Sequence, residues 1–245
     1  DMAFMNCPKL TTITLPDAIS TITADGTSSN DTYNYGTFQN CPINIVNVPS
    51  TVTSIPESIY NKSSINKFVC EDSEFVGGVG YFDDDGILYK KNIYTEVQHL
   101  VKCPNSKAVK TYTVLDGTTS IGSKAFQNKS TLTSLTIPSS VTSIGESAFV
   151  NCDVLKTIDI PDSVTTINSY AFSSCSLLVG AYFYGDTPSS FTANAFQNTK
   201  SGFTIYYIDG KSGWTTPTWN GYNTATFVPE QKTPVTGVTL SRATA

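Results

Sequence analysis

The dominant feature of this sequence is a pattern that repeats every 23 residues. An Ala-Phe pair opens three successive units, at positions 125–126, 148–149 and 171–172. The units follow the form A-F-x-x-C-x-x-L-x-x-I-x-I-P-x-S-V-x-x-I. A repeat of this length is one small supersecondary unit, which buries its apolar side only when a neighbouring unit stacks on it. The spacing therefore predicts a repeat solenoid.

The middle of each unit predicts a short β-strand. Ile158 and Ile160 alternate with the polar residues Thr157 and Asp159. Alternation with a period of two is typical of a strand with one buried face. Pro161 ends the strand, because proline has no N–H for a β-ladder and fixes its own φ angle. The apolar residues after the proline are then expected to line the return path to the next coil.

Weaker copies of the pattern extend the array over residues 1–228, in about eight coils. They predict one parallel strand per coil and little regular helix. The expected buried strand positions are Ile13, Val46, Phe68, Tyr112, Leu135, Ile158, Ala181 and Ile205.

Two insertions interrupt the period. Residues 24–35 are rich in Ser, Asn, Asp and Gly, which predicts a loop. Near residues 75–105, segments 80–82 and 87–89 flank an Asp-Asp-Asp-Gly turn, and 93–101 is a third alternating run. This arrangement predicts a β-hairpin or three-stranded meander that stands out from the solenoid.

Composition excludes several classes of function. Charged residues make up 14% of the chain, the formal net charge is -5 and the isoelectric point is about 4.8. An acidic chain without basic runs repels a phosphate backbone, so no nucleic acid is expected as a partner. No apolar run approaches the roughly 18 residues of a membrane span, so no transmembrane segment is expected. The chain opens on no signal peptide, so residue 1 is expected to be a processed or artificial start.

The chemistry-bearing residues form no catalytic pattern. The six cysteines contain no C-x-x-C pair, and there is one histidine, His99. These residues cannot build a typical zinc or thioredoxin-like site. No nucleophile–base pair, phosphate loop or metal cluster is visible. We therefore expect no enzyme activity, no cofactor and no metal, and we expect His99 to have a surface or packing role.

Two features of the sequence each allow two interpretations. Asp83, Asp84 and Asp85 could supply oxygen ligands to calcium, or they form a solvated turn. Cys7, Cys41, Cys152 and Cys175 share one repeat position, which Lys129 takes in another coil. That position is interpreted as a packing site for free thiols. The rival hypothesis is a disulfide between adjacent coils, Cys7–Cys41 or Cys152–Cys175, since coils stack about 5 Å apart.

The outward strand positions are the candidate binding surface. In the first coils they are mostly threonine, which also simply suits an exposed parallel sheet. Towards the C-terminal end they become Tyr182, Tyr184 and Tyr206, next to Thr157 and Asp159. Exposed aromatic side chains suit contacts with proteins or glycans. Trp214 and Trp219 follow, and they could instead cover the open end of the core.

The repeat units resemble the BspA-type leucine-rich repeats of bacterial surface proteins. Residues 148–167 and 125–145 carry the resemblance. The inserted D-G-I-L-Y-K-K-N at 85–92 looks like an interruption that is common in that family. The closing segment, residues 203–228, contains G-W-T-T-P-T-W-N-G-Y at 213–222, which looks like the closing segment of the family. Residues 229–245 resemble a linker and the truncated start of a bacterial immunoglobulin-like domain. The resemblance implies a leucine-rich-repeat solenoid and a longer parent protein.

The same resemblance implies the function. It predicts a non-catalytic, monomeric adhesion module at the bacterial cell surface or secreted from the cell. Its partner would be an extracellular protein of the host or of a neighbouring cell, or a glycan. The alternative is a structural spacer that displays another domain. An aromatic patch on the surface would favour binding, whereas a uniform Thr/Ser coat would favour the spacer.

Overall fold

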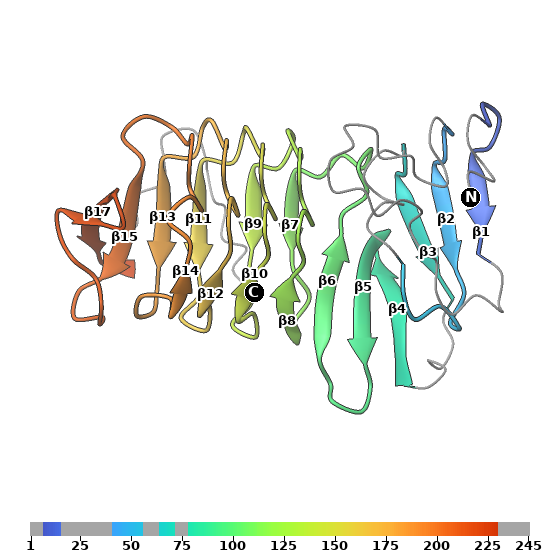
Figure 1. The fold of residues 1–245 in the computed structure, drawn as a ribbon, viewed down its shortest axis with the longest axis horizontal. Helices are drawn as coiled ribbons and strands as arrows, with labels where there is room; N and C mark the ends of the chain where they lie inside the picture. Colours follow the sequence, from blue (N-terminus) through green and yellow to red (C-terminus); the bar gives the residue numbers. More distant parts are fainter. Residues whose placement is uncertain (1–6, 16–40, 56–63, 72–77, 230–245) are drawn as a thin grey trace, which may run out of the picture.

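The computed structural model describes residues 7–15, 41–55, 64–71 and 78–229. Within these ranges the chain is an elongated stack of β-coils without α-helix (Figure 1). The expected loop at 24–35 lies outside the described residues. So does the expected immunoglobulin-like segment from residue 230 onward.

The strands predicted from the repeat form the first of two long faces. They fall into three hydrogen-bonded groups, β1-β2-β3, β7-β9 and β11-β13-β15-β17-β16. All neighbours pair in parallel except β16 and β17. The bounds are β1 Thr12–Thr14, β2 Ile45–Val48, β3 Lys67–Cys70, β7 Thr111–Thr113, β9 Ser134–Thr136, β11 Thr157–Ile160, β13 Gly180–Phe183, β15 Thr204–Ile208, β16 Thr218–Trp219 and β17 Tyr222–Phe227.

The register confirms the 23-residue period. Ile158 lies opposite Ala181, and Tyr112 lies opposite Leu135. Strands β9 and β11 are in contact, so the buried residues of successive coils lie on adjacent strands. The solenoid predicted from the spacing is therefore the fold of this chain.

The coils that contain β7, β9, β11 and β13 each carry a second strand on the return path, which the sequence pattern did not predict. These strands belong to a seven-stranded sheet in the order β14-β12-β10-β8-β6-β5-β4. Its repeat members align Ile121, Ile144 and Ile167 in parallel register. The bounds are β4 Val79–Asp84, β5 Ile87–Asn92, β6 Gln98–Lys102, β8 Thr118–Ile121, β10 Ser143–Ile144, β12 Thr166–Ile167 and β14 Ser190–Phe191.

A column of phenylalanines fills the core between the two faces. Phe126, Phe149, Phe172 and Phe196 are fully or almost fully buried. Successive ring centroids are 5.4, 4.9 and 5.1 Å apart, and the ring planes deviate from parallel by only 7–10°. This distance matches the spacing of neighbouring strands. The Ala-Phe pair therefore sets the stacking of the coils.

Small polar side chains also join the coils. The Ser140 and Ser163 hydroxyls, at equivalent positions, donate to carbonyls of the preceding coil at 2.9 and 2.7 Å. Asn128 and Asn151 adopt left-handed backbone conformations with φ near 60°, and their carboxamides are hydrogen-bonded at 2.8 Å. Asparagine tolerates this conformation better than most residues. The serines and asparagines at equivalent positions of the repeat thus hold adjacent coils together by hydrogen bonds.

The cysteine position is a packing site, and none of the six cysteines, all of which the structure describes, forms a disulfide. Cys152 and Cys175 are fully buried, and each thiol donates to a phenylalanine carbonyl of the preceding coil at 3.2 Å. The disulfide alternative is wrong for both pairs. In another coil Lys129 takes the same position. Its ammonium group donates to the carbonyls of Pro104, Asn105 and Lys107, and burial lowers its pKa.

The insertion is the predicted three-stranded meander, but it does not simply stand out from the solenoid. Strands β4, β5 and β6 pair antiparallel, and β6 then pairs in parallel with β8 (Figure 1). Ile87, Leu88 and Tyr89 on β5 are all completely buried. Ile87 and Tyr89 pack in the C-terminal core, whereas Leu88 packs in the N-terminal core. Strand β5 is therefore a partition within the solenoid.

Candidate binding surface

The outward positions of the first face are exposed or partly exposed, as the alternation predicts. In the middle of the array they carry Thr111, Thr113, Ser134 and Thr136. Such side chains give little contact area and suit a solvated sheet. This part of the face is a uniform polar ladder.

The outward side becomes aromatic towards its C-terminal end. The Tyr182 and Tyr206 rings, on paired positions of β13 and β15, stack with centroids 4.7 Å apart. Phe227 on β17 contacts Tyr182 and Tyr184 edge-on, at 5.2 and 5.4 Å. All four side chains are half-buried. We call Tyr182, Tyr184, Tyr206 and Phe227 the aromatic patch.

Small residues make room for the patch. Gly180 lies beneath the tyrosine pair, and a Cβ atom there would be 3.0 Å from Cε2 of Tyr206 and 3.4 Å from Cε2 of Tyr182. Ala225 faces Tyr206 across the ladder. A methyl group at 180 would thus displace the rings.

A carboxylate borders the patch on β11. Asp159 is exposed and lies opposite Tyr182, while the partly exposed Thr157 lies opposite Gly180. Burial, and then Tyr206 and Asp159, raise the pKa of Tyr182. Burial, and then Asp159 and Tyr182, raise the pKa of Tyr184. Both hydroxyls therefore remain protonated hydrogen-bond donors beside a negative charge.

The structure brings together the three predicted tyrosines, Thr157 and Asp159, and adds Phe227. Sequence reasoning missed Phe227 because β17 lies beyond the last recognisable copy of the repeat. The alternation of residues 222–227 was the available signal. It became meaningful only when β17 paired in parallel with β15.

The tryptophans belong to a different cluster, which covers the end of the core. Trp214 stacks on Tyr207 at 5.3 Å, and its indole N–H donates to the Gly185 carbonyl at 3.1 Å. The ring centroids of Trp219 and Phe191 lie 4.5 Å apart. Both tryptophans pack against the core, whereas Tyr182 and Tyr184 pack against Phe227 on the outward side. The aromatic patch is therefore separate from the tryptophan cluster that covers the end of the core.

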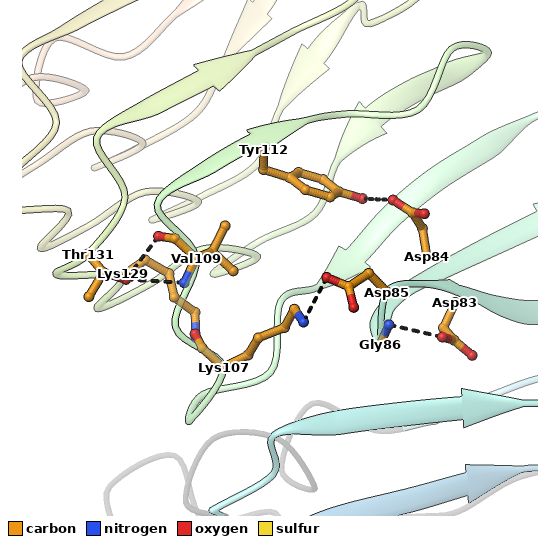
Figure 2. Close-up of polar contacts among 9 residues, drawn as sticks. All are labelled: Asp83, Asp84, Asp85, Gly86, Lys107, Val109, Tyr112, Lys129 and Thr131. Carbon is orange, nitrogen blue, oxygen red and sulfur yellow. Dashed lines mark hydrogen bonds and ion pairs between the residues drawn. The ribbon is translucent and has the colours of Figure 1, made fainter. Parts of the chain in front are cut away.

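The three inserted aspartates diverge towards separate protein partners, as Figure 2 shows. The Asp83 carboxylate accepts from the Cys70 and Gly86 backbone N–H groups, at 2.7 and 3.0 Å. Tyr112 donates to Asp84 at 2.7 Å, and Lys107 forms an ion pair with Asp85 at 3.0 Å. These aspartates fasten the inserted turn to its surroundings and do not converge on one point.

His99 lies in a polar row on the second sheet. Its Nδ1 is 2.5 Å from the Ser120 hydroxyl, and Lys90 is its neighbour in register. Burial and the Lys90 charge lower the pKa of His99. The imidazole is thus a packing and hydrogen-bonding group of the sheet.

Among the described residues, no three His, Cys, Asp or Glu side chains gather closely enough to hold a metal ion. The same residues include no helix that is long and apolar enough to cross a membrane.

Comparison with known sequences identifies one repeat type along most of the chain. The profile of the BspA type leucine rich repeat region matches residues 1–98 and 102–211, in six copies. A search of curated protein sequences found no significant match.

Solved structures share the fold. A leucine rich cell surface protein from Faecalibacterium prausnitzii is 22% identical, with a TM-score of 0.59 over 87% of this chain and 62% of its own. A leucine-rich repeat protein from Eubacterium ventriosum is 24% identical, with a TM-score of 0.54 over 71% of this chain and 44% of its own. The pneumococcal vaccine antigen PcpA is 18% identical, with a TM-score of 0.58 over 81% of this chain and 51% of its own. The chain thus spans less than two thirds of each of these proteins.

Proposed function

This chain belongs to the BspA type leucine rich repeat family, and we propose that it is a non-catalytic binding module of a bacterial cell-surface protein. In this proposal it engages an extracellular protein or glycan through the aromatic patch. The assignment to the cell surface draws on the description of the Faecalibacterium protein as a cell surface protein.

One observation carries the proposal: four aromatic side chains gather on the outward side of a face whose middle strands present only threonine and serine there. Aromatic side chains give large contact area for few frozen torsions and dominate interface energetics. The patch also carries a cost, because exposed apolar surface promotes aggregation. A spacer would need only the threonine ladder, so the patch favours binding over display.

The test is a comparison of two pairs of alanine variants on an array of extracellular-matrix proteins and glycans. Tyr182→Ala and Tyr206→Ala should each weaken binding by about 1 kcal/mol or more, because each removes contact area at the patch. Thr113→Ala and Thr136→Ala, at outward positions of the polar ladder, should leave the affinity unchanged. Equal effects of both pairs, or no partner on the array, would contradict the proposal.

A further inference from the structure

A second feature of the C-terminal end is a cleft away from the aromatic patch. It lies between the turn that follows β14 and the β16–β17 turn, and it has a volume of about 540 Å³. It is open to solvent. The side chains that matter for its chemistry are Asn194, Gln197, Asn198, Thr199, Asn220 and Tyr222.

The cleft exists because the stack of Ala-Phe turns ends there. In the preceding coils, the backbone N–H groups of Asn128, Asn151 and Ser174 donate to carbonyls of the next coil, at 2.8, 3.1 and 2.8 Å. Asn198 is the equivalent residue of the last such turn. No carbonyl accepts from its N–H group in the part of the chain that the structure describes. A donor that normally binds protein is therefore left for solvent or a ligand.

The same turn holds an aromatic ring in a fixed position. The Tyr222 hydroxyl accepts from the Phe196 backbone N–H at 3.2 Å and donates to the Ala193 carbonyl at 2.6 Å. It thus replaces a group that the next coil would have provided. The ring packs edge-on against Phe196 and Phe203, at 5.8 Å from each. Tyr222 therefore gives the cleft a rigid, half-buried apolar wall.

Apart from Ala193, Phe196 and Gly221, the remaining lining is polar, and none of it carries a charge. Four carboxamides surround the cleft, and each can both donate and accept a hydrogen bond. Asn198 and Asn220 hold left-handed backbone conformations, with φ of 57° and 48°, within turns. An ionic ligand would lose hydration here without meeting an opposite charge. A purely apolar ligand would leave the amides without partners.

We propose that this cleft binds a neutral saccharide unit. Vicinal hydroxyls donate and accept in the same way as carboxamides, and the hydrocarbon face of a sugar ring suits the wall formed by Tyr222. A ligand oxygen would take the N–H of Asn198. The volume lies within the roughly 300–1,000 Å³ range of small-molecule sites. This site is independent of the binding function proposed for the aromatic patch.

The experiment is an NMR titration of the 245-residue chain with defined sugars. The neutral probes are N,N′-diacetylchitobiose and methyl α-mannoside, and the charged comparators are glucosamine and N-acetylneuraminic acid. A neutral probe at about 10 mM, a concentration that detects millimolar affinity, should shift the side-chain amide signals of Gln197 and Asn198 and the backbone amide of Asn198. The charged probes should shift them less.

One double variant and two control variants decide where the sugar binds. Gln197→Ala with Asn198→Gly removes two amides, and glycine keeps the left-handed conformation. The dissociation constant should rise about tenfold or more, given the hydrogen bonds lost. Asn151→Gly, at the equivalent position two coils earlier with φ of 60°, should leave it unchanged. Tyr206→Ala should also leave it unchanged, although it weakens binding at the patch.

Several outcomes would overturn the proposal. They are the absence of shifts with both neutral probes, equal shifts with the charged probes, and shifts that persist in the Gln197→Ala/Asn198→Gly variant. The proposal for the aromatic patch can fail separately, because its array test depends on Tyr182 and Tyr206 and not on this cleft.

Discussion

A partly buried row of hydrogen bonds joins the insertion to the regular coils. The Leu115 N–H donates to the Tyr89 hydroxyl at 3.4 Å, Tyr89 donates to Tyr112 at 2.6 Å, and Tyr112 donates to Asp84 at 2.7 Å. Buried polar groups contribute most when every member has a partner. These hydrogen bonds therefore link β5, β7 and the inserted turn.

The two tyrosines should make stability depend on alkaline pH. Burial is the main cause that raises the pKa of Tyr89 to about 12, and burial with the bond to Tyr89 raises that of Tyr112. In the unfolded chain both lose protons near pH 10. The folded state then binds more protons, so its free energy of unfolding falls as the pH rises from about 10 towards 12.

The measurement is urea unfolding at pH 8, 9, 10 and 11. The stability difference between the wild type and the Tyr89→Phe/Tyr112→Phe variant should be constant below about pH 9 and shrink at pH 10 and 11. A difference that does not change over this range would refute the role of the tyrosine protons.

At the scale of elements, β5 is distinguished by three successive completely buried residues, Ile87, Leu88 and Tyr89, so both of its faces are buried. The repeat strands bury one face and expose the other. Successive residues of β5 point into two separate cores, with Leu88 on the N-terminal side and Ile87 on the C-terminal side. The β4–β5 turn also binds to the edge of β3, because the Phe68 N–H donates to the Gly86 carbonyl at 3.2 Å.

Adjacent substitutions in β5 should therefore loosen different halves of the molecule. Ile87→Ala and Leu88→Ala should each destabilise the chain by about 2–4 kcal/mol, since each leaves a cavity in a packed core. Hydrogen exchange should show lost protection in β7 and β8 for Ile87→Ala, and in β2 and β3 for Leu88→Ala. The exposed Thr113→Ala serves as the control. If both core variants loosen the same strands, β5 is not a partition.

The whole molecule is one stack with two unequal cores. The C-terminal core contains the stacked phenylalanine column, whereas the N-terminal core has Phe68 as its one buried phenylalanine among the described residues. In repeat proteins stability is approximately a sum of local coil and interface terms. The two ends are therefore expected to differ in stability.

Native-state hydrogen exchange can measure this difference. Amides of β2 and β3 should open at a free energy lower by about 1 kcal/mol or more than those of β11 and β13, because fewer buried apolar contacts oppose local opening. A single opening free energy along the whole stack would show instead that the solenoid unfolds as one unit.

The sequence by itself determined the solenoid, its period and the position of its strands. The reason is that stacking repeats the same environment every coil, so equivalent residues such as Phe126, Phe149 and Phe172 meet the same demand. It also indicated free cysteines, because slot-equivalent side chains point in the same direction. The three-stranded meander was visible from alternation around a turn.

Only the tertiary structure decided what depends on contacts between unlike segments. The return strands β8, β10, β12 and β14 are too short to give a periodic signal, and they form because the neighbouring coils supply partners. The sequence could not place Leu88 and Ile87 in different cores, since that follows from the docking of β5. In the same way, Phe227 joined the aromatic patch, and the cleft beside Tyr222 formed, because the closing segment folds back on the last coil.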